Sequence, residues 1–122
     1  MKKTRVLLDF VKLAIADKIA FYRNVISKLT GNAAFSNPDV ALVDAKTSVD
    51  KLENLYLASR DGGHSIISAM HAAEDDTDDL FRILAAYVSR IANGDEAMIL
   101  SSGFNYMKQP AAKQKDILAV EN

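Results

Sequence analysis

Three amphipathic stretches, each followed by a glycine-containing stop, dominate this sequence. The stops are Thr30-Gly31-Asn32, Asp61-Gly62-Gly63 and Asn93-Gly94-Asp95. Within the stretches, apolar residues recur every three or four positions, which is the period of a helix with one buried face. Glycine readily takes the left-handed backbone conformation that ends many helices. The pattern therefore predicts an all-α fold whose consecutive helices are joined by short loops.

The first predicted helix runs from about residue 16 to residue 29, and its charged residues, Lys18 among them, lie mostly off the apolar face. The second begins at Asn37-Pro38-Asp39, because asparagine caps free backbone amides and proline suits the first helical turn. It continues to about Arg60. Short loops between helices favour antiparallel neighbours.

The third predicted helix, residues 64–92, is the longest, and its apolar positions alternate steps of four and three without a break. Such near-heptad spacing suits helices packed at a shallow angle. Asp95-Glu96 then opens a short fourth helix that stops before Gly103. We therefore predict an up-down bundle of three main helices plus a short fourth helix, formed by residues 1–103, with residues 104–122 as a largely extended C-terminal tail or connector.

The apolar spacing also predicts which side chains form the core. Phe35, in the loop after the first helix, is expected to plug into it. The other expected core residues are Ile19, Tyr22, Ile26, Leu42, Val49, Leu52, Tyr56, Met70, Leu80, Leu84 and Val88.

Composition excludes several classes of function. The 15 basic and 16 acidic side chains give a net charge of −1, which provides no basic footprint for nucleic acid. The absence of cysteine excludes disulfides, thiolate catalysis and cysteine-based zinc sites. Asp9 and Lys12 interrupt the apolar run near the start, so we expect no signal peptide and synthesis in the cytoplasm. No apolar stretch approaches the roughly 20 residues that span a bilayer, so no membrane partner is expected.

Histidine chemistry is the main enzymatic alternative. His64 and His71 lie seven residues apart on the third predicted helix, too far apart to share one metal ion without a bend. His71 and Asp75, four residues apart, are better placed for a shared metal, but a dinuclear carboxylate bundle needs Glu-x-x-His motifs on two helices. We therefore predict no catalytic residue, no metal ligand and no cofactor, and keep a metal-dependent enzyme using His71 and Asp75 as the alternative.

Two features suggest contact with other proteins instead. The first is an acidic run on the third helix, interpreted as a solvated helix face or a docking patch for basic segments. The second is a pair of apolar ends, residues 6–10 and 104–107, which carry several aromatic side chains. The candidate interaction residues are Phe10, Glu74, Asp75, Asp76, Asp78, Asp79, Phe104 and Tyr106.

Several segments in combination resemble a known type of domain. They are DKIAFYRNV (17–25), LTGN (29–32), NPDV (37–40), SRDGG (59–63), IANGDEA (91–97), LSSGF (100–104) and KQP (108–110). Together they are similar to the helical domain that often precedes a fibronectin type III module in small bacterial and phage proteins. The resemblance covers nearly the whole chain and implies no catalytic residue. In such proteins residues 119–122 would lead into the first fibronectin strand.

The resemblance and the lack of a convergent catalytic set together predict a non-enzymatic structural or interaction module. The most specific form of this hypothesis is a subunit or decoration component of a larger assembly such as a phage capsid, made in the cytoplasm and released in the virion. Its partners would be proteins, either further copies or other subunits, with no nucleic acid and no small-molecule substrate. The remaining alternative is a bacterial protein–protein adaptor or adhesion-associated module.

Overall fold

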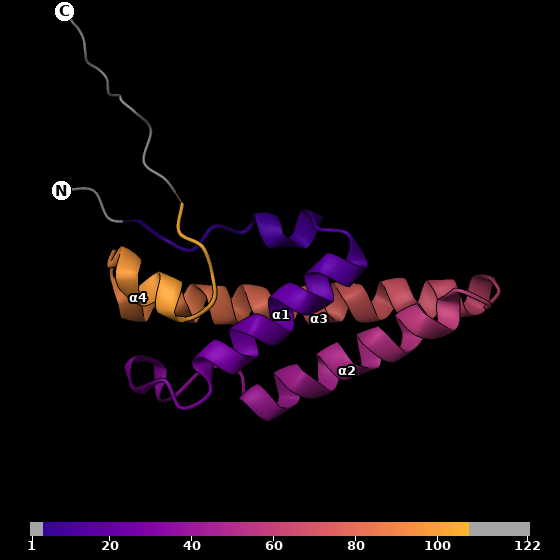
Figure 1. Cartoon of the computed structure of the whole chain (residues 1–122), viewed down its shortest axis with the longest axis horizontal. Coiled ribbons are helices and arrows are strands. Elements are labelled where there is room, and N and C mark those ends of the chain that lie inside the picture. Colours follow the sequence, from indigo (N-terminus) through magenta and orange to yellow (C-terminus); the bar gives the residue numbers. More distant parts are fainter. Residues whose placement is uncertain (1–3, 108–122) are drawn as a thin grey trace, which may run out of the picture.

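The computed structural model describes residues 4–107 and confirms the all-α class. Three long helices and a short one form the bundle; one 3₁₀ turn precedes the first helix and another lies between the first two helices (Figure 1). The elements are η1 (Asp9–Lys12), α1 (Ile15–Leu29), η2 (Ala33–Phe35), α2 (Leu42–Ser59), α3 (His64–Ala92) and α4 (Glu96–Ser101). The predicted bounds of the third helix are confirmed at both ends.

Helix α3 runs the length of the molecule, α2 packs along it in the opposite direction, and α1 packs on α2 and crosses α3 (Figure 1). It ends where Asn93 adopts a left-handed conformation with φ 49° and its N–H donates to Ser89 O. Asp95 then begins α4, its side chain accepting from the Met98 N–H at 3.2 Å. An aspartate in this position satisfies an amide that the helix leaves free.

The predicted start of the second helix is wrong by several residues. Helix α2 begins at Leu42, and the residue at its N-cap is Ala41 rather than Asn37. Residues 37–41 instead turn toward α3, where the Asn37 N–H donates to Tyr87 Oη and the Asp39 carboxylate pairs with Arg90 at 3.0 Å. These tertiary contacts hold the asparagine and proline outside the helix that their local preferences favour.

The two ends of the described chain pair with each other. Val6 and Tyr106 form an antiparallel bridge, flanked by bonds from Leu7 N–H to Asn105 O at 2.8 Å and from Met107 N–H to Arg5 O at 2.7 Å. We call residues 4–7 and 105–107 the ribbon. Residues 104–107 of the predicted tail therefore stay on the bundle. The rest of the predicted tail, 108–122, lies outside the described residues.

The core confirms most of the sequence prediction. Seven expected residues are buried, and Phe35 fills the core from its loop as predicted. The other four pack against the core as partly buried side chains. The buried seven are Ile19, Tyr22, Val49, Leu52, Met70, Leu84 and Val88; the partly buried four are Ile26, Leu42, Tyr56 and Leu80.

Candidate interaction surfaces and a buried polar network

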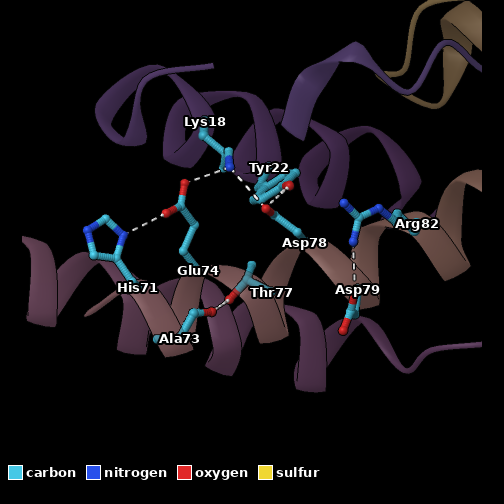
Figure 2. A network of polar contacts seen from close by, with 9 residues as sticks. All are labelled: Lys18, Tyr22, His71, Ala73, Glu74, Thr77, Asp78, Asp79 and Arg82. Carbon is cyan, nitrogen blue, oxygen red and sulfur yellow. Dashed lines mark hydrogen bonds and ion pairs between the residues drawn. The ribbon is translucent and has the colours of Figure 1, made fainter. Parts of the chain in front are cut away.

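The acidic run on α3 divides between two sides of the helix. Asp75, Asp76 and Asp79 are exposed, whereas Glu74 and Asp78 turn toward α1 (Figure 2). Residues four apart lie on one side of a helix, which explains why 74 and 78 leave the solvated face together. The interpretation of the run as a single solvated patch is therefore wrong for these two residues, and most clearly for Asp78, which is 6% exposed.

Lys18 on α1 is the reason that two carboxylates can lie here. Its ammonium donates to Glu74 Oε2 at 2.7 Å and to Asp78 Oδ2 at 3.0 Å, and the residue is only 1% exposed. Tyr22, one helical turn later, donates its hydroxyl to Asp78 Oδ1 at 2.6 Å (Figure 2). Buried charges are tolerated when they are paired and hydrogen-bonded in this way. The expectation that Lys18 lies off the buried face is wrong.

Burial and hydrogen bonding shift the pKa values of two members of this network. Burial, reinforced by the hydrogen bond to Asp78, raises the pKa of Tyr22 far above its ordinary value. At Glu74 burial works in the opposite sense to its partners, but the Lys18 ammonium and His71 outweigh it and lower the pKa of the carboxyl. The network therefore holds Tyr22 as a neutral donor and Glu74 as an anion.

The Tyr22 ring itself is closed off by packing. It stacks on Phe81 with centroids 3.9 Å apart and an interplanar angle of 13°. Beside it, the Thr77 hydroxyl donates to Ala73 O at 2.7 Å and also meets Ser48 Oγ of α2 at 2.6 Å. These contacts fix α1 and α2 on α3, so the network acts as a structural lock between helices.

The metal alternative rests on His71 and Asp75, and among residues 4–107 no ion pair joins these two side chains. His71 Nδ1 lies 3.3 Å from Glu74 Oε1 rather than near Asp75, and its side chain is 60% exposed (Figure 2). His64 is exposed in the first turn of α3. Between residues 4 and 107 no group of three His, Asp or Glu side chains is placed to hold a metal ion.

The apolar ends proposed as contact surfaces need a correction as well. Phe10 and Phe104 are 2% and 1% exposed, and their ring centroids lie 5.6 Å apart inside the core. They belong to the core because the ribbon folds both ends onto the bundle. Tyr106 is partly buried. The exposed apolar side chains of this region are their neighbours Leu8, Leu100 and Met107.

These neighbours border two hollows, one on each side of the ribbon. The first hollow, of about 620 Å³, lies beside residues 105–107 and is lined by Leu7, Leu100, Asn105, Tyr106 and Met107. The second hollow, of about 440 Å³, lies between residues 5–8 and α3. Its lining is Arg5, Val6, Leu8, Arg82, Ala85, Ala86, Ser89 and Met107. The sequence pattern drew attention to this region but did not show which side chains face outward.

Two further findings bear on function. None of the helices described between residues 4 and 107 has the length and apolar character needed to cross a membrane. Comparison of the chain with protein-family models, curated proteins and solved structures gave no match. The resemblance to a helical domain that precedes fibronectin type III modules therefore stays a prediction.

Proposed function

We propose that this chain is a non-enzymatic interaction module that serves as a subunit or decoration component of a larger assembly, such as a phage virion. The observation that carries the proposal is the first hollow, an apolar depression formed where the two ends of the described chain meet. Leu100 is 50% exposed and Met107 is 36% exposed on its walls. An apolar depression on a small domain is the kind of surface that a protein partner covers.

The ribbon supplies a second element of such a contact. Asn105 O and Met107 N–H point toward residues 4–7, so the backbone of Tyr106 points toward the opposite edge. Among residues 4–107 that edge has no hydrogen-bond partner. The edge residues Asn105, Tyr106 and Met107 carry no charge, and charge is a usual means of keeping strand edges from pairing. A neighbouring subunit that places an extended apolar segment here would bond to Tyr106 and fill the first hollow.

The resemblance described above supplies the biological context. A helical domain associated with fibronectin type III modules is consistent with a particle component built from protein subunits. The partners are accordingly proteins, and the proposed role requires no cofactor, nucleic acid or membrane.

Incorporation into particles tests this function. The tagged chain would be expressed in its native host, and particles would be purified on a density gradient and assayed for the chain. We expect it in the particle fraction, and we expect Leu100→Glu to reduce its incorporation roughly tenfold or more, since burying one leucine contributes about 1.5–3 kcal/mol. Leu57→Glu is the matched control, because Leu57 is 51% exposed on α2, away from the first hollow. A chain that is absent from every particle fraction would refute the proposal.

A further inference from the structure

Helix α3 presents one continuous exposed face to solvent. Its members recur at three- and four-residue spacing along the side opposite the core, and the apolar side chain at its centre, Ile83, is 46% exposed. They are Ala72, Asp75, Asp76, Asp79, Arg82, Ile83, Ala86 and Arg90. We call this set the outer face of α3.

Charge is divided unequally along the outer face. The end toward the N-terminus of α3 carries Asp75, Asp76 and Asp79, Arg82 lies beside Ile83 at the centre, and the C-terminal end carries Arg90. Arg5 adds a third guanidinium on the second hollow, which borders this basic end. The outer face is therefore acidic at one end and basic at the other, and its centre holds Ile83 beside Arg82, whose charge is paired with Asp79.

Contacts within the chain satisfy only some of these charges. Arg82 binds Asp79 at 2.7 Å and Arg90 binds Asp39 at 3.0 Å, and all four side chains stay more than 40% exposed. Asp75, Asp76 and Arg5 have no ion-pair partner anywhere in residues 4–107. Two carboxylates at one end and a guanidinium at the other thus remain available for a partner of complementary charge.

We propose that a second copy of this chain binds the outer face in an antiparallel orientation, with the two-fold axis near Ile83. Positions 75–76 lie about two turns on one side of that axis, and Arg90 lies about two turns on the other. The rotation therefore places Asp75 and Asp76 of each copy against Arg90 and Arg5 of the other. A two-fold contact is self-complementary, so the same ion pairs form twice and Ile83 packs on its counterpart.

The shape of the second hollow supports the same contact independently of the charges. Ala85, Ala86 and Ser89 are small, which lets another helix approach α3 closely there, and Leu8 adds an exposed apolar wall. The side chains at the acidic end of the second copy would enter this hollow between Arg5 and α3. The second hollow shares only Met107 with the first hollow, and none of the four charged residues of the proposed contact lines the first hollow, so self-association here does not depend on the proposed function.

Charge reversal tests the proposed dimer. The masses of four proteins would be measured by sedimentation equilibrium: the full chain, Asp75→Lys/Asp76→Lys, Arg5→Glu/Arg90→Glu, and the control Asp44→Lys/Asp61→Lys. The control changes net charge as much as the first variant, at exposed positions off the outer face. We expect a dimer for the full chain and the control, and a dissociation constant at least about tenfold higher for each reversed variant, since like charges then face each other.

Mixing the two reversed variants gives the decisive result. In the mixed pair, lysines face glutamates on one side of the axis and the native charges meet on the other, so we expect the dimer to return. Far-UV circular dichroism confirms that each variant is folded, and a variant that loses helicity is replaced by its single form, Asp76→Lys or Arg5→Glu. A monomeric full chain, a reversed variant that dimerises like the control, or a mixture that stays monomeric would each overturn the proposal.

Discussion

Helix α1 is held by two clusters of ion pairs that differ mainly in burial. On one side Lys18 reaches Glu74 and Asp78 of α3, and on the other Arg23 reaches Asp50 and Glu53 of α2. In each cluster one cation of α1 binds two carboxylates of the neighbouring helix. The Lys18 side chain is 1% exposed, whereas the Arg23 side chain is 36% exposed.

This difference in burial determines what each cluster contributes. Water can solvate Arg23 and its partners when they separate, so exposed pairs of this kind stabilise little. Lys18 and Asp78 have no such alternative, and their separation inside the protein would leave bare charges in a poorly polarisable interior. The Lys18 cluster therefore restricts α1 to one position along α3, whereas the Arg23 cluster tolerates small shifts of α2.

Replacement of the lysine has the largest expected effect. Lys18→Met keeps an unbranched side chain but leaves Asp78 and Glu74 facing each other without a cation, and we expect a loss of about 3–5 kcal/mol in the free energy of unfolding. Urea titration followed by circular dichroism measures it. Adding Asp78→Asn to Lys18→Met removes one of the stranded charges and should recover part of the loss. A Lys18→Met variant as stable as the wild type would show that the buried pairs do not lock α1.

The next largest expected effect is the loss of folding stability at alkaline pH, which comes from the raised pKa of Tyr22. Its pKa is raised in the folded protein by burial and by the bond to Asp78, so the neutral hydroxyl contributes stability that is complete below the ordinary tyrosine value near 10.0. That stability falls as the pH rises above this value, because the unfolded chain can lose the proton while the folded chain holds it. We expect the tyrosinate absorbance of Tyr22 to appear together with loss of helicity.

The variant Tyr22→Phe tests whether Tyr22 ionises only when the protein unfolds at alkaline pH. It should remove one tyrosinate from the absorbance change that accompanies alkaline unfolding. If Tyr22 ionised while helicity stayed intact, the hydroxyl would not be locked to Asp78.

The smallest effect is expected for Arg23→Met. Hydrogen bonds from Lys46 and Arg23 lower the pKa of Asp50, so this pairing contributes stability above the ordinary carboxyl pKa and loses it as the pH falls. Glu74 follows the same direction inside the protein. Salt distinguishes the exposed Arg23 pairs from the buried Lys18 pairs. The Debye length falls to about 3 Å at 1 M salt, and this screening weakens exposed pairs far more than buried ones. The stability difference between wild type and Arg23→Met at neutral pH should therefore vanish in 1 M salt, whereas that of Lys18→Met should persist.

The bundle itself was predictable because its signals are local. The regularly spaced apolar residues of 64–92 and the stop at Asn93-Gly94 predict α3. The same periodicity identifies most of the core residues. The start of α2 was not predictable in the same way. Asn37-Pro38 has every local mark of a helix start, but bonds to Tyr87 and Arg90, about fifty residues away, decide otherwise.

The surfaces were less predictable for a related reason. A lysine and an aspartate are normally exposed, so no pattern in residues 18 or 78 shows that they meet in the interior. The five acidic residues of α3 look equivalent in the sequence, and only the position of α1 separates Asp78 from Asp76. Similarly, the sequence left open whether Phe104 anchors the tail to the bundle or forms an exposed edge, and only the ribbon shows that it packs against Phe10.

The ribbon has a mechanical consequence. Thr4 and Met107 meet at its open end, where the threonine hydroxyl donates to Met107 O. A pulling force applied to the two ends of the described chain would load that contact first, then the Arg5–Met107 bond, and only afterwards the Leu7–Asn105 bond. Bonds loaded one after another yield at lower force than bonds sheared together. Tension along the chain would therefore peel the ribbon and uncover Phe10 and Phe104 before it unravels the three long helices.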